Sequence, residues 1–233
     1  MLRNIIFSIF FFSGIILISI LFLPALLLPQ KIVLFGGKLM GHWAGICLKI
    51  LMSTKIKVLG KENIINDSNF FIAATHQSMF ETFYLQTIFK FPVFILKKEL
   101  LKIPIFGWYL KKIGSISIDR NKVTKDNFRF FDDIIKILKN TNRPLIIFPQ
   151  GTRVKPEEKP PFKKGVARIY EKINVPCQPV VINSGYVWPK KGVKVAKKTI
   201  TISILPKIDY GMEKEYFLKN LEEKIYLELD KIN

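Results

Sequence analysis

One histidine and one glutamate, His76 and Glu81, have the types and spacing of an acid–base pair. His76 directly follows the apolar run of residues 70–74, at the start of a turn, and Glu81 comes five residues later. On a regular helix, five residues rotate by about 500°, which puts the two side chains on different faces. A pairing therefore requires His76 in the loop and Glu81 in the first helical turn. There the carboxylate could hold one ring nitrogen and leave the other free as a base.

The same segment allows a purely structural interpretation. The residues from Ser78 to Glu81 match a helix capping box, in which the glutamate side chain bonds back to the backbone of the serine. Spacing alone leaves both interpretations open. His76 remains a candidate because the chain has only two histidines, and the other, His42, lies in an apolar N-terminal segment.

Polar groups suited to an anion follow another predicted strand. Gly151 lets backbone amides approach an anion, Thr152 adds a hydroxyl donor, and Arg153 offers a fork of N–H groups that fits phosphate. For this segment alone, a surface turn with a solvated arginine is the alternative. Charged residues also end two further strands, at Lys97 and Arg120, so these groups could share one rim.

Short β-rich runs and helical patterns alternate from about residue 55 onwards. Strands are predicted at residues 56–59, 70–74, 93–96, 115–118, 145–148, 177–182 and 199–205. Helices are predicted at residues 80–89, 105–112, 125–139, 165–173 and 214–231. This alternation predicts an α/β fold with a largely parallel central sheet flanked by helices.

The N-terminal segment has the pattern of a membrane anchor. Residues 5–28 carry no charge, and as a helix they would extend about 36 Å, against about 30 Å for a hydrocarbon core. The run is too long for a cleaved signal peptide. Residues 32–52 form a second apolar helical pattern, in which Gly37, Gly41 and Gly45 would let another helix approach closely. We expect a two-helix membrane motif at residues 1–53 and one catalytic domain at 54–233; a soluble amphipathic second helix is the alternative.

The composition is strongly basic and poor in cysteine. The formal charge of +19 would attract nucleic acid, anionic lipid or acidic proteins without choosing among them. The apolar N-terminus favours anionic membrane lipids over nucleic acid, and the basic remainder favours the cytoplasmic face. Cys47 and Cys177 lie far apart, in no metal-ligand spacing, and are expected to be buried thiols in a reducing compartment.

Four blocks of the chain, within roughly residues 55 to 190, resemble the glycerolipid acyltransferase family in order and spacing. The blocks are residues 76–81, residues 97–120, residues 148–153 and residues 175–181. Two positions depart from the family pattern, which usually has aspartate where Glu81 stands and glutamate where Gln150 stands.

The resemblance implies an O-acyltransferase. It implies transfer of an acyl chain from acyl carrier protein or coenzyme A to the free sn-2 hydroxyl of 1-acyl-glycerol-3-phosphate, giving phosphatidic acid. His76 would be the base and Glu81 its partner, with no metal or redox cofactor. The residues expected to bind substrate are Lys97, Arg120, Gln150, Gly151, Thr152 and Arg153. The alternatives are an acyltransferase for another lyso-lipid, such as lyso-ornithine lipid, and a non-catalytic basic membrane tether.

Overall fold

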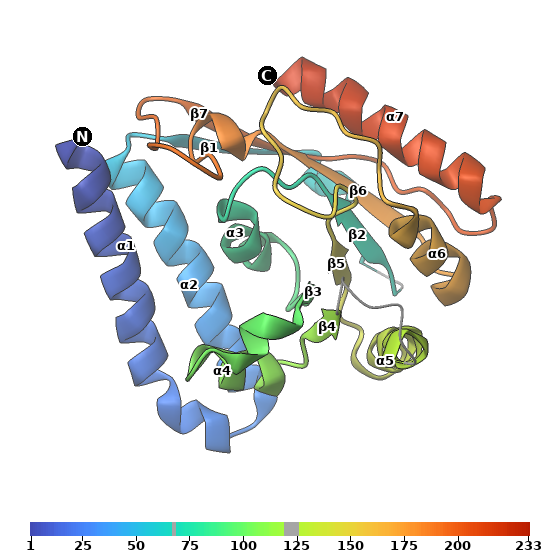
Figure 1. Cartoon of the computed structure of the whole chain (residues 1–233), viewed down its shortest axis with the longest axis horizontal. Helices are drawn as coiled ribbons and strands as arrows, with labels where there is room; N and C mark the ends of the chain where they lie inside the picture. Colours follow the sequence, from blue (N-terminus) through green and yellow to red (C-terminus); the bar gives the residue numbers. More distant parts are fainter. Residues whose placement is uncertain (67–68, 119–125) are drawn as a thin grey trace. The chain divides into compact units, whose positions relative to one another are not determined.

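The computed structural model describes residues 1–66, 69–118 and 126–233 (Figure 1). The chain forms two compact units. One consists of residues 1–51 and 82–145, and the other of residues 52–81 and 146–233. The elements are those predicted for an α/β fold. Within residues 55–233, each predicted helix or strand begins and ends within two residues of the boundaries of the observed element.

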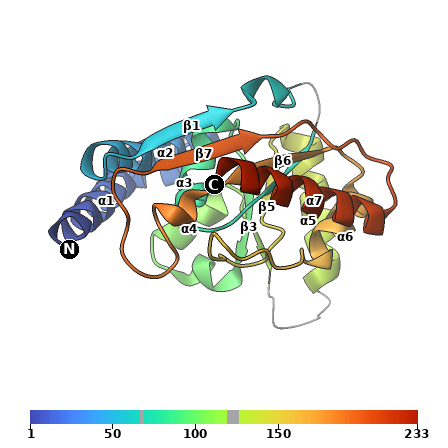
Figure 2. The ribbon, with the colours of Figure 1, turned by 90° about the horizontal axis from the view of Figure 1, so that it is seen from above.

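The second unit holds the strands that carry the candidate histidine. They are β1 (Lys55–Leu59), β2 (Phe71–Ala74), β6 (Cys177–Ile182) and β7 (Thr199–Ile204), with β5 (Leu145–Ile147) next to β2. The pairs β1–β7 and β2–β6 are parallel, as predicted. The pair β6–β7 is antiparallel. A parallel pair needs a long crossover connection, usually an α-helix, and the connection between these two strands contains no α-helix. In Figure 2, β1 and β7 run side by side.

Two helices of the same unit pack against this sheet. α6 (Lys164–Ile173) and α7 (Lys214–Ile232) contact each other, and α7 contacts β6 and β7. The rings of Tyr170 and Phe217 stack with centroids 3.7 Å apart, and Phe71 of β2 meets Phe217 edge-on at 6.2 Å. All residues of β2 and β6 are buried, which is typical of central strands with apolar side chains on both faces.

The first unit contains the N-terminal helices. α1 (Leu2–Leu21), the short η1 (Leu23–Leu27) and α2 (Gln30–Leu51) form a hairpin in which α1 and α2 pack side by side (Figure 1). A Cβ on Gly14 would lie 2.1 Å from the indole nitrogen of Trp43, so only glycine permits this approach. That nitrogen donates to the carbonyl of Phe11 at 3.2 Å.

The remaining elements of the first unit are a parallel strand pair and three helices. The strands are β3 (Val93–Lys97) and β4 (Ile116–Ile118), and the helices are most of α3 (Phe80–Ile88), α4 (Phe106–Lys112) and α5 (Asp126–Thr141), with η3 (Lys98–Lys102) between β3 and α4. The close approach predicted along the glycine line of α2 is confirmed at Gly41, where a Cβ would lie 2.4 Å from the carbonyl oxygen of Phe83 in α3.

Among the described helices, α1 alone is long and apolar enough to cross a membrane, with a mean hydropathy of 2.4 over its most apolar window. Only 11% of that window is buried, unlike the core helix of a soluble domain. α2 is two residues longer but carries Lys31, Lys38 and Lys49.

Candidate active site

The ends of β2 and β6 are joined directly before the candidate histidine. The hydroxyl of Thr75 donates to the carbonyl of Ile182 at 3.0 Å and accepts from its N–H at 2.7 Å. Because β2 and β6 are parallel neighbours, the segments that follow them leave the same edge of the sheet. His76 and Ser184 stand on these two segments.

Three groups from residues 148–154 hold His76. Its backbone N–H donates to the side-chain oxygen of Gln150 at 2.7 Å, and its carbonyl accepts from the N–H of Val154 at 2.9 Å. Its ring stacks on Phe148 with centroids 4.0 Å apart and an angle of 16° between the planes. Backbone and imidazole are therefore oriented together by one loop.

Glu81 lies in the first turn of α3, and its side chain is fully buried. The carboxylate accepts hydrogen bonds from the backbone N–H groups of Gln77 at 3.3 Å and Ser78 at 3.0 Å, and from the hydroxyl of Ser184. The bond back to Ser78 is the one that the capping-box interpretation predicts. The hydroxyl of Ser78 itself accepts from the N–H of Phe80 at 2.9 Å.

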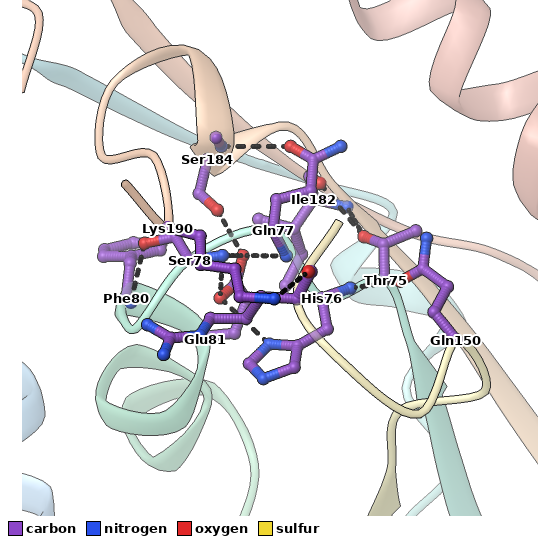
Figure 3. Close-up of polar contacts among 12 residues, drawn as sticks. Thr75, His76, Gln77, Ser78, Phe80, Glu81, Gln150, Ile182, Ser184 and Lys190 are labelled. Atoms are coloured by element: carbon purple, nitrogen blue, oxygen red, sulfur yellow. Dashed lines mark hydrogen bonds and ion pairs between the residues drawn. The ribbon is translucent and has the colours of Figure 1, made fainter. Parts of the chain in front are cut away.

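The same carboxylate also faces the histidine. Oε2 of Glu81 lies 3.5 Å from Nδ1 of His76 (Figure 3). Nδ1 is buried, and no described residue makes a hydrogen bond of normal length with it. The capping bond does not exclude the pairing, because the same carboxylate accepts from the Ser78 N–H and lies 3.5 Å from Nδ1 of His76. The catalytic pairing stays a prediction. A carboxylate at Nδ1 selects the tautomer that leaves Nε2 free as a base and stabilises the imidazolium.

The loop after β5 offers groups for an anion beside this pair. Gly151 has a φ of 73°, which favours glycine, and its N–H donates to the carbonyl of Phe148 at 2.9 Å. Thr152 is exposed and Arg153 partly exposed, and the Arg153 guanidinium forms no ion pair with any described residue. Nζ of Lys190 lies 3.3 Å from the Thr152 hydroxyl and 3.1 Å from the Arg153 carbonyl oxygen.

The structure brings together six of the eight predicted site residues in the second unit: His76, Glu81, Gln150, Gly151, Thr152 and Arg153. Lys97 is exposed at the end of β3 in the first unit. Arg120 lies outside the described residues. Gln150 is 2% exposed, and its observed partner is the backbone of His76; its contact with a substrate stays a prediction.

Sequence reasoning did not single out three residues that contact this site. Ser184 and Gln77 are uncharged, and Lys190 is one of many lysines. Gln77 is simply the neighbour of His76 in the chain, whereas Ser184 and Lys190 are brought to the site by contacts between distant segments, which no local pattern indicates.

Gln150 should be replaceable by a residue that keeps its acceptor oxygen. We expect Gln150→Glu to retain most of the stability and transfer activity, because a carboxylate can still accept from the His76 N–H. Gln150→Leu should lose about 1–3 kcal/mol of unfolding free energy, because it leaves that donor unpaired. Thermal unfolding and transfer rates of both variants check this. Inactive Gln150→Glu beside active Gln150→Leu would contradict it.

Comparison with known proteins identifies the class of this fold and site. Residues 55–183, more than half of the chain, match the family model described as Acyltransferase. The chain belongs to the acyltransferase family.

Relatives with assigned names support this family assignment. A 1-acyl-sn-glycerol-3-phosphate acyltransferase of Pseudomonas aeruginosa is 32% identical over 161 residues, which are 68% of this chain and 61% of that protein. One of Helicobacter pylori is 33% identical over 163 residues, or 67% of each chain. The chain thus spans about three fifths to two thirds of the length of these two relatives.

A solved structure shares the fold. The crystal structure of the 1-acyl-sn-glycerophosphate (LPA) acyltransferase from Thermotoga maritima superposes with a TM-score of 0.80 at 24% identity, covering 100% of this chain and 98% of that one.

Proposed function

We propose that this chain transfers an acyl group from a thioester to the sn-2 hydroxyl of 1-acyl-glycerol-3-phosphate, forming phosphatidic acid. The observation that carries the proposal is the placement of His76, with Nδ1 facing the buried carboxylate of Glu81. The activity for which the relatives from P. aeruginosa and H. pylori are named supports the same substrate.

In the proposed reaction, Nε2 of His76 removes the proton from the acceptor hydroxyl as its oxygen attacks the thioester carbonyl. A carbon–oxygen bond forms, and the tetrahedral intermediate then breaks its carbon–sulfur bond. The imidazolium returns the proton to the leaving thiolate, so the products are an ester and a free thiol. Glu81 stabilises the imidazolium in between. A positioned base contributes about 10²–10⁴-fold, and alignment of the two substrates supplies the remainder.

The acceptor phosphate is assigned to the loop of residues 151–153. A guanidinium can hold two phosphate oxygens at once, and Arg153 is partly exposed without an ion-pair partner among the described residues. Lys190 lies against the same loop and adds positive charge. Lys97 and Arg120 stay proposed ligands on the resemblance alone.

The acyl donor is proposed to be a thioester of acyl carrier protein or of coenzyme A. We propose no metal, no redox cofactor and no nucleic-acid partner. We further propose that α1 and α2 attach the chain to the membrane and that the catalytic residues work at the cytoplasmic face. The exposed apolar surface of α1 and the charge of +19 support binding to anionic lipid.

The deciding experiment is a transfer assay with the purified full chain in anionic lipid vesicles. Lysophosphatidate and lyso-ornithine lipid are offered as acceptors, each with acyl carrier protein and coenzyme A thioesters. We expect phosphatidic acid to form and thioester release to depend on lysophosphatidate. Acylation of lyso-ornithine lipid alone would overturn the substrate and keep the acyltransferase class. No acceptor-dependent release with either donor would favour the non-catalytic tether.

Arg153→Lys tests how the acceptor is recognised. The variant keeps the charge and loses the two-pronged contact. A hydrogen bond to a charged group contributes roughly 1.5–3 kcal/mol, so kcat/KM for lysophosphatidate should fall about 10- to 150-fold. Any activity on an acceptor without phosphate should change little.

The matched control is Arg168→Lys, which makes the same exchange on an exposed arginine of α6 and should leave both rates unchanged. If Arg153→Lys lowers kcat/KM equally for both acceptors, Arg153 supports the loop and does not bind the acceptor phosphate.

A further inference from the structure

Ser184 makes a contact with Glu81 that neither the sequence blocks nor the proposed acid–base pair requires. It stands in the short helix η4 (Ser184–Tyr186) after β6 and is 0% exposed. Its hydroxyl donates to Oε1 of Glu81, while Oε2 of the same carboxylate faces Nδ1 of His76. Oε1 thus meets Ser184, on the turn after β6, and Oε2 faces His76 (Figure 3).

A second contact ties the same two segments together. The N–H of Gly185 donates to the side-chain oxygen of Gln77 at 3.0 Å, and Gln77 is also fully buried. A Cβ on Gly185 would lie 2.8 Å from the ring of Pro156 and 3.0 Å from Gln77. The segment after β6 therefore packs against residues 77–81, which end the loop after β2 and begin α3. The bond from the Gly185 N–H helps to hold the Ser184 hydroxyl in place.

The backbone bonds to Glu81 constrain the rotation of its carboxylate only weakly, because they are long or shared between its two oxygens. The N–H groups of Gln77 and Ser78 both approach Oε1, and that of Ser78 also approaches Oε2. A bond shared between both oxygens does not by itself fix the rotation of the carboxylate about its last bond. Two donors reach Oε1 alone, the Gln77 N–H at 3.3 Å and the Ser184 hydroxyl. Together they favour the rotation in which Oε2 points at His76, and the shorter bond comes from Ser184.

We propose that Ser184 is a positioning residue for the acyl-transfer reaction. Its hydroxyl holds the Glu81 carboxylate in the orientation that fixes the tautomer of the His76 ring. The kinetic part of the proposal rests on the proposed function.

A double-mutant cycle in the full chain tests the proposal, using wild type, Ser184→Ala, Glu81→Gln and the double variant. We expect Ser184→Ala to lower kcat at least tenfold with KM for both substrates unchanged. In the Glu81→Gln background the same exchange should cost less than twofold, because its effect passes through the carboxylate. Ser184→Cys, with a weaker donor, should fall between wild type and Ser184→Ala. An equal loss in both backgrounds, or an unchanged kcat, would overturn the proposal.

Ser203 provides the matched control. It is another buried serine of the same unit, and its hydroxyl donates to the Glu228 carboxylate at 2.7 Å. Ser203→Ala removes the same kind of bond away from the candidate site and should change thermal stability while kcat stays within twofold. A tenfold loss of kcat in this variant would show that any lost serine–carboxylate bond has the effect, and would overturn a specific function for Ser184.

A spectroscopic readout separates this proposal from the proposed function. With His42→Asn, His76 is the only histidine, so ¹⁵N-histidine NMR reports its tautomer without any substrate. We expect one tautomer, protonated at Nδ1, and a mixture of both tautomers after Ser184→Ala. An identical spectrum in both proteins would overturn the positioning function even if transfer is observed. Failure of wild-type transfer together with a changed spectrum would reject the substrate and retain Ser184 as the residue that orients the pair.

Discussion

His76→Ala is expected to lower the rate of acyl transfer by about 10²–10⁴-fold, the contribution of a positioned general base. The backbone at residue 76 keeps its bonds to Gln150 and Val154, since both use main-chain atoms. The fold should therefore persist, although the ring stacking on Phe148 and the contact of Nδ1 with Glu81 are lost. Initial rates with lysophosphatidate and thermal unfolding of the same preparation measure the two effects separately.

His42 supplies the comparison for this prediction. It is the other histidine of the chain and is exposed on α2. His42→Ala should leave the transfer rate within about twofold, because no general-base contribution is removed. A folded His76→Ala protein with activity within tenfold of wild type would remove His76 from the mechanism.

Glu81→Gln should have the second large effect, up to about 10⁴-fold in kcat, the loss seen when the carboxylate of a serine-protease triad is replaced by the corresponding amide. A neutral amide does not stabilise the imidazolium and permits the wrong tautomer. The contacts of Glu81 also predict a stability loss, because an NH₂ group in place of one oxygen would face the N–H of Ser78. An unpaired buried donor costs about 1–3 kcal/mol, so the rate should fall further than stability explains.

A substitution at Glu213 is the control that distinguishes the loss of a helix cap from an effect on catalysis. Its carboxylate caps α7 by accepting from the N–H groups of Glu215 and Tyr216. Glu213→Gln makes the same exchange at a helix start that lies outside the candidate site, and should affect thermal stability alone. If Glu81→Gln likewise lowers stability and leaves kcat unchanged, Glu81 is only a capping residue.

The elements of this fold could be predicted from the sequence because they depend on local patterns. Runs of apolar residues between turn signals predicted the strands, and periodic stripes predicted the helices. The placement of His76 after β2 followed from the same reasoning, since it needs only the end of a strand. The capping bond of Glu81 was predictable too, because Ser78 and Glu81 are three residues apart.

The limits of local reasoning are clearest at Glu81. Spacing treated capping and pairing as alternatives, whereas the buried carboxylate accepts from the Ser78 N–H and also lies 3.5 Å from Nδ1 of His76, so that neither excludes the other. The antiparallel pair β6–β7 was also not indicated, because strand direction depends on the path of the connecting loop.

The sequence by itself determined the element types, the positions of the candidate acid–base residues and the family resemblance. Only the tertiary structure decided what holds those residues in place. The Gln150 oxygen reaches His76 across 74 residues of sequence, and the Ser184 hydroxyl reaches Glu81 across 103. Such contacts arise because parallel strands place their carboxyl ends along one edge of a sheet, so loops remote in sequence become neighbours there. Neither the residue types nor their spacing indicate which loops will be neighbours, because this depends on the order of the strands within the sheet.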